Sequence, residues 1–162
     1  MIQITDDLGT LHTFETTPKR IITLVPSLTE TLFELGLEEQ IIGLTKFCVH
    51  PYHLKSVKIN VGGTKNVHIE KIKALNPDII IANKEENTLE VVDSLKEIGP
   101  VVVTDIVTID DTLKTIPDVG TIFKRTTDAK KWIEKINFAY ADFQHFMQEK
   151  AVQKVAYLIW RE

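Results

Sequence analysis

Residues 22–36 read ITLVPSLTETLFELG, and this stretch decides the fold because its pattern recurs downstream. The pattern returns in IIGLTKFCVHP at 41–51 with VGGTKNVHIEKIKAL at 61–75, and again in PDIIIANKEENTLEVVDSL at 77–95. Each unit has a short strand that is apolar throughout, then a polar loop, then a helical pattern. Such strands are typical of a parallel sheet covered on both faces, and open α/β sheets bind ligands at the loops that follow the carboxyl ends of their strands.

The rest of the sequence completes an α/β fold, which we predict to be a three-layer lobe with a mostly parallel sheet, an N-terminal hairpin and a long C-terminal helix. Apolar residues on either side of the turn at 6–9 predict the hairpin. Strands are expected at 21–24, 41–44, 78–81 and 101–104, and helices at 27–35, 67–75, 88–98 and 110–123. The expected capping residues are Ser27 with Glu30, then Asn66, and Asn87 with Glu90. Pro117 is expected to kink or split the last of these helices.

A longer pattern occupies residues 127–150, where apolar side chains recur at helical spacing with no internal Gly or Pro. It predicts a helix about 35 Å long, since each residue adds about 1.5 Å. Residues 154–160, KVAYLIW, have the composition of a strand. An apolar strand of this kind normally joins a sheet, because its exposed edge would otherwise pair with other chains.

Composition limits the class of protein. The 162 residues are 43% hydrophobic and 26% charged, which suits one globular domain. A net charge of −4 argues against a general nucleic-acid binder, which needs a basic stripe. The apolar runs are too short to span a bilayer, and the first residues lack the basic start and apolar block of a signal peptide. Cys48 is the only cysteine, so no internal disulfide is expected.

Three segments carry a resemblance to a known family: PKRIITLVPSLTE at 18–30, Gly62-Gly63-Thr64, and IEKIKALNPDIIIA at 69–82. In this order they resemble the N-terminal lobe of the helical-backbone substrate-binding proteins of ABC importers, the receptors for cobalamin, ferric siderophores and haem. The resemblance implies two α/β lobes joined by one long helix, with the metal chelate in the cleft between them and a membrane permease as partner. It implies a binding protein with no covalently bound cofactor rather than an enzyme, located in the periplasm or otherwise outside the cytoplasm. Composition alone is also compatible with a cytoplasmic protein.

The resemblance also divides the chain. Residues 1–126 correspond to the N-terminal lobe, 127–150 to the inter-lobe helix and 151–162 to the first strand of a second lobe. The sequence is therefore expected to be part of a longer protein that holds the other half of the cleft. Tyr157, Leu158 and Trp160 are expected either to pack back on this lobe or to cause self-association through the C-terminal strand.

The candidate ligand-binding residues lie in or next to the loops after the strands: Ser27, Phe47, Cys48, His50, Thr64, Lys65, Asn83 and Lys84. Ser27 either meets an anionic ligand group at a helix N-terminus or only caps its helix. Phe47 either fills the core or, as the resemblance implies, covers the ligand in the cleft. Residues 83–87 either hydrogen-bond a ligand or form a solvated turn. Thr64 and Asn83 fall near positions where the cobalamin receptors have tryptophans, which favours a smaller or more polar chelate.

Patterns for metal ligation and catalysis are weak. Cys48, His50 and His53 form a short string of potential ligands, but a structural zinc site needs four, so a loop histidine and a buried thiol are the favoured interpretation. Residues 62–66 are glycine-rich without the spacing of a phosphate-binding loop, and are expected to let the backbone turn beside the cleft. No nucleophile elbow or metalloprotease motif occurs.

Glu70 has a separate expected role. In the resembling receptors an acidic residue early in this helix engages basic residues of the permease, although most exposed carboxylates only keep a surface soluble. Two other functions stay open, which are a single-lobe interaction or assembly module and a nucleotide-binding α/β enzyme. Stabilisation by metal chelates would favour the receptor over both.

Overall fold

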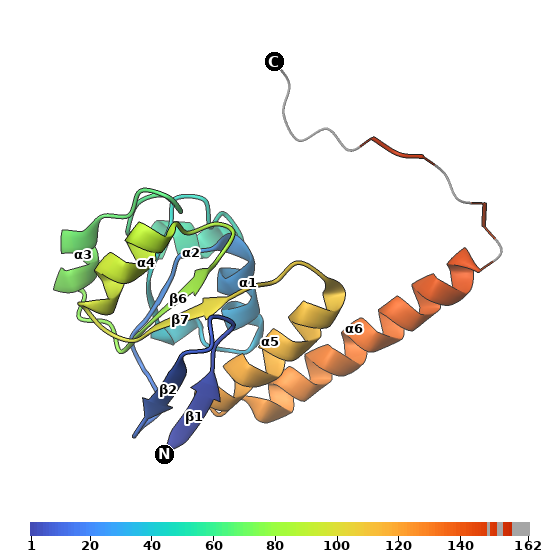
Figure 1. The fold of residues 1–162 in the computed structure, drawn as a ribbon, viewed down its shortest axis with the longest axis horizontal. Coiled ribbons are helices and arrows are strands. Elements are labelled where there is room, and N and C mark those ends of the chain that lie inside the picture. The colour runs from blue at the N-terminus through green and yellow to red at the C-terminus, as the bar shows by residue number, and fades with distance from the viewer. Residues whose placement is uncertain (149, 152–153, 157–162) are drawn as a thin grey trace.

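The computed structural model describes residues 1–148, 150–151 and 154–156, which form a two-stranded hairpin, a five-stranded sheet and six α-helices (Figure 1). The strands are β1 (Ile2–Thr5), β2 (Leu11–Phe14), β3 (Ile21–Thr23), β4 (Ile41–Leu44), β5 (Ile59–Asn60), β6 (Ile79–Asn83) and β7 (Val101–Thr104). The helices are α1 (Pro26–Glu34), α2 (Tyr52–Val57), α3 (Ile69–Ala74), α4 (Leu89–Lys96), α5 (Ile109–Ile122) and α6 (Thr126–Met147), with a short 3-10 turn η1 (Glu38–Gln40).

The predicted three-layer α/β architecture is confirmed. The sheet is parallel throughout, in the order β5-β4-β3-β6-β7, and β6 and β7 are buried along their whole length. Figure 1 shows why: α3 and α4 lie on one side of the sheet, and α1, α5 and α6 on the other. Strands covered on both faces need apolar side chains at every position, which explains the unbroken runs of Ile and Val.

The topology determines where a ligand can bind. The chain runs from β3 outward to β4 and β5, and then returns to the other side of β3 to form β6 and β7. Strand order therefore reverses between β3 and β6. Open α/β sheets bind ligands outside the carboxyl ends of the strands next to such a reversal.

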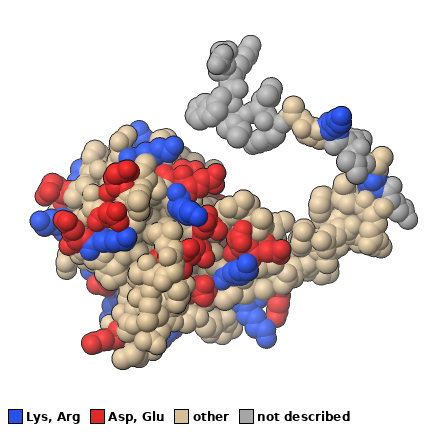
Figure 2. Space-filling model, in the orientation of Figure 1, with Lys and Arg blue, Asp and Glu red and all other residues tan. Residues whose placement is uncertain are grey.

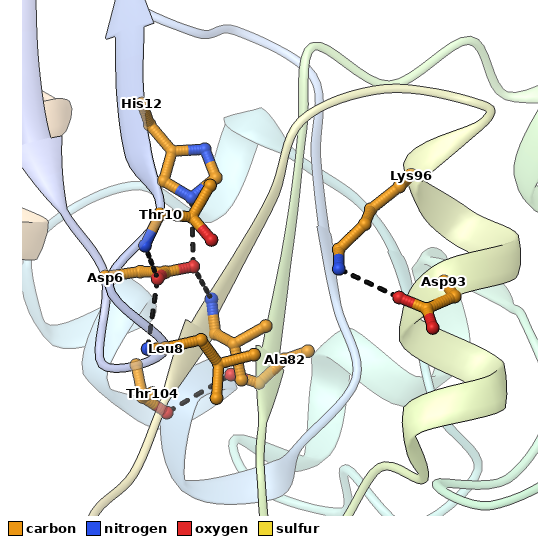
Figure 3. A network of polar contacts seen from close by, with 9 residues as sticks. Asp6, Leu8, Thr10, His12, Ala82, Asp93, Lys96 and Thr104 are labelled. Carbon is orange, nitrogen blue, oxygen red and sulfur yellow. Dashed lines mark hydrogen bonds and ion pairs between the residues drawn. The ribbon is translucent and has the colours of Figure 1, made fainter.

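The N-terminal hairpin is joined to the edge of the sheet by hydrogen bonds of Asp7 with Val103 and Asp105 and by the buried carboxylate of Asp6, shown in Figure 3. Asp6 Oδ1 accepts the N–H groups of Leu8 and Thr10 at 3.0 and 2.8 Å, and Oδ2 accepts from His12 Nε2 at 3.0 Å and from the Val103 N–H at 3.2 Å. Burial by itself would raise the pKa of Asp6, but the hydrogen bonds from His12, Thr10 and Val103 outweigh it and hold the pKa below its ordinary value.

The last two helices pack closely and α6 then leaves the lobe. An added Cβ at Gly120 of α5 would lie 2.6 Å from the Cβ of Ala129 in α6, so glycine is needed at this crossing. The 22 residues of α6 span about 33 Å. Its described residues from 141 onward are all exposed, and Figure 1 shows this end projecting beyond α5. The predicted long helix is thus present, while its connection to a second lobe stays a prediction.

Two predicted helix starts were wrong. The N-cap of α1 is Val25, whose side chain makes no capping bond, and Ser27 lies inside the first turn instead of forming a capping box. Pro26 at the first helical position has the φ of a helix already and needs no N–H partner, so the chain enters the helix earlier than predicted. Asn66 does not cap α3, because Val67 pairs with Gly62 in an isolated bridge and the helix starts only at Ile69.

The later helices also differ in detail. Thr88 caps α4 in place of Asn87, and its Oγ1 accepts the N–H of Val91 at 3.4 Å. Thr108 and Asp111 form a capping box at the start of α5, which then runs uninterrupted through Pro117. Of the predicted kink or split at Pro117, the split was therefore wrong, while the kink stays a prediction.

Two short elements lie between the predicted strand at 41–44 and the predicted helix at 67–75, where neither was expected. They are α2 and β5, and each is too short to give a clear sequence pattern. Residues 154–156 lie in no helix or strand, and the rest of the strand predicted at 154–160, with Tyr157, Leu158 and Trp160, lies outside the described residues. In the described part of the chain, none of the helices has both the length and the apolar character needed to cross a bilayer.

Candidate functional site

The loops after β4 and β5 enclose a shallow groove of about 520 Å³ at the carboxyl end of the sheet. We call it the rim groove, and it is lined by Lys46, Phe47, Asn60, Gly62, Gly63, Thr64, Lys65, Asn66, His68 and Lys71. Three of the predicted ligand-binding residues, Phe47, Thr64 and Lys65, are brought together in it.

Phe47 presents an aromatic surface to solvent instead of filling the core. Its side chain is 50% exposed although large aromatic residues are usually buried. One edge of the ring faces Gly63, where an added Cβ would lie 3.5 Å from Phe47 Cε2, and Lys46 Nζ lies 5.0 Å from the ring centroid. The ring thus lies against the groove wall next to the Lys46 ammonium group, and half of the side chain stays exposed to solvent.

The glycines after β5 make the sharp turn that shapes the groove. Gly62 has a φ of +112°, and an added Cβ would lie 2.6 Å from the backbone oxygen of Asn66. The Gly62 N–H donates to Asn60 Oδ1 at 2.8 Å, and the Gly63 N–H donates to the Asn66 oxygen at 2.9 Å. Because these N–H groups already have acceptors, the loop does not offer them to a phosphate, which disfavours nucleotide binding here.

Asn87 joins the loop after β5 to the loop after β6. Its Oδ1 accepts the Asn83 N–H at 2.9 Å, and its Nδ2 donates to the Thr64 backbone oxygen at 2.7 Å. The side chain is only 3% exposed. Thr64 and Asn83 therefore lie on the same edge of the sheet, and Phe47 shares the groove with Thr64. Asn87 was missed as a site residue because an Asn before a helix has the pattern of a cap.

Asn83 and Lys84 are committed to partners within the lobe. Asn83 is buried, its Nδ2 donates to Thr104 Oγ1 at 3.2 Å, and its Oδ1 accepts the Glu85 N–H at 3.0 Å. Lys84 Nζ lies 2.6 Å from Asp105 Oδ2, and this hydrogen-bonded ion pair raises the pKa of Lys84. In this conformation both residues position their loop instead of facing the rim groove.

Cys48 is buried in the structure, so its predicted contact with a ligand has no exposed surface to support it and stays a prediction. Its side chain is fully buried, with Sγ 3.1 Å from Thr29 Oγ1 and 3.3 Å from Thr45 Oγ1. These contacts anchor the loop that carries Phe47. A ligand in the rim groove would have to displace the loop to reach the thiol.

The string of potential metal ligands is dispersed by the fold. His53 Nε2 lies 2.8 Å from Glu38 Oε1, away from the buried Cys48, while His50 is exposed on the same loop as Phe47 without lining the groove. Within the residues that the structure describes, no group of three or more Cys, His, Asp or Glu side chains could hold a metal ion.

Ser27 is exposed but lies in a different hollow. It lines a groove of about 350 Å³ between α1, α5 and α6, which we call the helix groove, together with Glu30, Thr31, Glu34, Leu35, Thr112, Ile116, Trp132 and Ile136. The structure therefore separates Ser27 from the rim groove. Glu70, by contrast, is exposed in the first turn of α3, two residues beyond the groove residue His68.

Comparison with known proteins shows which family the chain resembles. A family model described as periplasmic binding protein matches residues 21–161. The chain is 31% identical over 112 residues to YvrC of Bacillus subtilis, an uncharacterized ABC transporter substrate-binding lipoprotein, with 67% of this chain and 35% of the relative covered. It is 27% identical over 129 residues to a vitamin B12-binding protein of Pectobacterium atrosepticum, covering 79% of this chain and 46% of the relative.

A solved structure extends the likeness to three dimensions. The iron uptake ABC transporter substrate-binding protein PiuA from Streptococcus pneumoniae superimposes with a TM-score of 0.85 and 26% identity, over 93% of this chain and 55% of that one. The chain thus spans about half or less of the length of these relatives. As the resemblance in its strands and loops implied, the chain belongs to the periplasmic binding protein family.

Proposed function

We propose that the chain is the N-terminal lobe of the substrate-binding component of an ABC importer, and that the rim groove is its share of the site for a metal chelate. One observation carries the proposal: the loops after β4, β5 and β6 converge on one edge, with Phe47 and Thr64 in one groove and Asn87 joining the loops of Thr64 and Asn83. Relatives named for vitamin B12 binding and iron uptake support a cobalamin or an iron chelate as the ligand class.

The residues of the edge would act in two groups. Phe47 would cover an apolar part of the ligand, while Thr64 and Lys65 would contact its polar edge and His50 would border the site. Asn83 and Lys84 would hold the neighbouring loop in place through Thr104 and Asp105. We propose binding without catalysis, so that affinity and not turnover is the property to measure.

A second lobe and a permease complete the proposed mechanism. The ligand would be enclosed between this lobe and its counterpart, and the closed protein would dock on the permease outside the cytoplasm. Glu70 is proposed as a docking residue because it is exposed at the same end of the lobe as the rim groove. In cells that carry the full-length gene, Glu70→Arg should lower chelate uptake. Glu97→Arg, which reverses an exposed charge at the far end of α4, should not.

Thermal denaturation with added ligand tests the binding function. We would titrate the chain with ferric citrate, a ferric tricatecholate, haemin and cyanocobalamin, since a ligand that binds only the folded state raises Tm with concentration. Phe47→Ala should remove this shift, and Val49→Ala, on the same loop but outside the groove, should retain it. A shift that survives Phe47→Ala, or no shift with any of the four compounds, would reject the rim groove as the site.

The interaction module remains the second candidate because of one observation. The distal part of α6 carries Phe143, Phe146 and Met147 at 55, 60 and 40% exposure, although Lys150 Nζ lies 4.6 Å from the centroid of the Phe146 ring. Figure 2 shows the same contrast on one face, with charged side chains over the body of the lobe and few along the end of α6. Sedimentation velocity together with the ligand titration discriminates the receptor from the interaction module. A stable dimer that binds none of the four compounds would favour the interaction module.

A further inference from the structure

The charges that line the rim groove are all of one sign. Its ionisable side chains are Lys46, Lys65, Lys71 and His68, and no Asp or Glu is among its lining residues. The chain as a whole has a net charge of −4, with 23 acidic residues against 19 Lys and Arg. The groove is therefore lined only by cationic and neutral groups, although the chain as a whole carries more acidic than basic residues.

The three groove lysines also lack carboxylate partners. Among the described residues, none of them lies within 4.0 Å of a carboxylate oxygen, and all three are exposed. Of the lysines outside the groove, Lys84, Lys96, Lys114, Lys130 and Lys131 do have such a partner, while others such as Lys55, Lys58 and Lys73 have none among the described residues. What distinguishes the groove is that three unpaired lysines line it together with no acidic residue. The groove thus holds uncompensated ammonium groups, which repel one another and favour an anion between them.

We propose that the ligand of the rim groove is a metal chelate of net negative charge, whose carboxylate or catecholate oxygens are bound by Lys46, Lys65 and Lys71 while Phe47 covers an apolar part of the chelate. This inference rests on the proposed function and narrows it. It disfavours cobalamin, because cyanocobalamin has no net charge and gains little from ammonium groups. An anionic ferric chelate would neutralise the lysines and use the aromatic surface at once.

Nearby carboxylates limit the distance over which the positive potential of the groove lysines attracts an anion. Glu70, Glu85 and Glu86 are exposed beside the groove without lining it. At physiological salt, charges beyond about 8 Å are largely screened. The anionic arms of the ligand must therefore touch the lysines directly. Selectivity should depend on the three named side chains and not on the charge of the lobe as a whole.

Calorimetric titration with two compounds of different charge tests the inference. The compounds are an iron(III) tricatecholate, which is a trianion, and cyanocobalamin. The test variant is Lys46→Gln/Lys65→Gln/Lys71→Gln. The control is Lys73→Gln/Lys114→Gln/Lys130→Gln, which removes the same charge from exposed helical lysines outside the groove. Circular dichroism checks that both variants fold, and the single variant Lys71→Gln is the fallback if the triple variant does not.

We expect the wild-type chain to bind the tricatecholate more tightly than cyanocobalamin. The groove variant should weaken tricatecholate binding by about tenfold or more, since each exposed charge pair contributes up to about a factor of five. The control should stay within about twofold, and wild-type affinity should fall as salt rises from about 50 to about 200 mM.

The outcomes separate the inference from the function on which it rests. If cyanocobalamin binds as tightly as the tricatecholate or more so, and Phe47→Ala abolishes that binding, the receptor function stands and the anionic ligand is refuted. Equal weakening by the groove and control variants would also refute it. Binding of neither compound to the wild-type chain would count against the receptor function itself.

Discussion

Replacing Asn87 with alanine should destabilise the loops that form the candidate site. The substitution removes the acceptor of the Asn83 N–H and the donor to the Thr64 oxygen, which now lie 2.9 and 2.7 Å from the amide atoms. Asn87 is 3% exposed, so water does not readily replace it. Each buried polar group left without a partner costs about 1–3 kcal/mol, so the two together predict a loss of about 2–6 kcal/mol in the free energy of unfolding. For a chain of this size, even the lower figure lowers Tm by about 4 °C.

Urea unfolding followed by circular dichroism measures this loss. Asn66→Ala is the matched control, because Asn66 lines the same groove but is exposed and its side chain makes no hydrogen bond within the described part of the chain. We expect the control to stay within about 0.5 kcal/mol of wild type. An Asn87→Ala variant that is equally close to wild type would refute the assignment of Asn87 as the joint between the two loops.

Three further substitutions test the fold around the site. Gly62→Ala should destabilise more than Gly9→Ala, because both glycines have positive φ but only at Gly62 would a Cβ meet backbone, 2.6 Å from the Asn66 oxygen; equal unfolding free energies would contradict this. Gly120→Ala should lower the free energy of unfolding by about 1–3 kcal/mol, because the added Cβ pushes α5 away from α6. Adding Ala129→Gly should restore part of this loss, and no restoration would mean that the two Cβ positions do not compete. Asp6 has a lowered pKa in the folded state, so its contribution to stability is present above its unfolded pKa of about 3.9 and is lost as pH falls through the lower folded value. Asp6→Asn should therefore reduce stability at neutral pH and flatten the acid limb of the stability profile, and parallel profiles for the two proteins would contradict this.

Much of the fold could be predicted because burial on both faces leaves a distinctive pattern. Apolar runs such as residues 79–81 and 101–103 are typical of strands that are buried because helices cover both faces of the sheet. The helical periodicity of α6 continues over enough residues to be unambiguous. Helix starts were harder to predict. Several residues that can cap a helix lie side by side, and the choice between Asn87 and Thr88 depended on the tertiary contact of Asn87 with Thr64.

The candidate site could be predicted only in part. Phe47 was found because it follows a predicted strand, which places it at one edge of any parallel sheet. Thr64 was found from the glycine-rich segment that carries the family resemblance, since the strand before it was not predicted. Ser27 also follows a strand, but Pro26 draws it into α1 and it lines the helix groove instead. Cys48 follows Phe47 directly and points inward to Thr29 and Thr45, a reversal that loop sequence does not reveal.

The groove lysines could not be predicted as site residues from the sequence. Lys46 and Lys71 were not predicted as ligand-binding residues, because they lie 25 residues apart and lysines are common on any surface. The turn at Gly62, its bridge to Val67 and the hydrogen bond from the Lys46 N–H to the Gly62 oxygen bring the start of α3 beside the loop after β4. Their chemistry became apparent once the fold had placed them around one groove.

Chemical-shift mapping tests most directly whether the loops at the carboxyl edge of the sheet bind a chelate. The ¹⁵N-labelled chain would be titrated with gallium(III) tricatecholate, a diamagnetic counterpart of the iron complex, and with cyanocobalamin. We expect saturable shifts in residues 45–50, 62–68 and 83–87, with the helix groove and the hairpin unchanged. Shifts confined to the helix groove, or no saturable shift with either compound, would contradict the assignment of the rim groove as the ligand site.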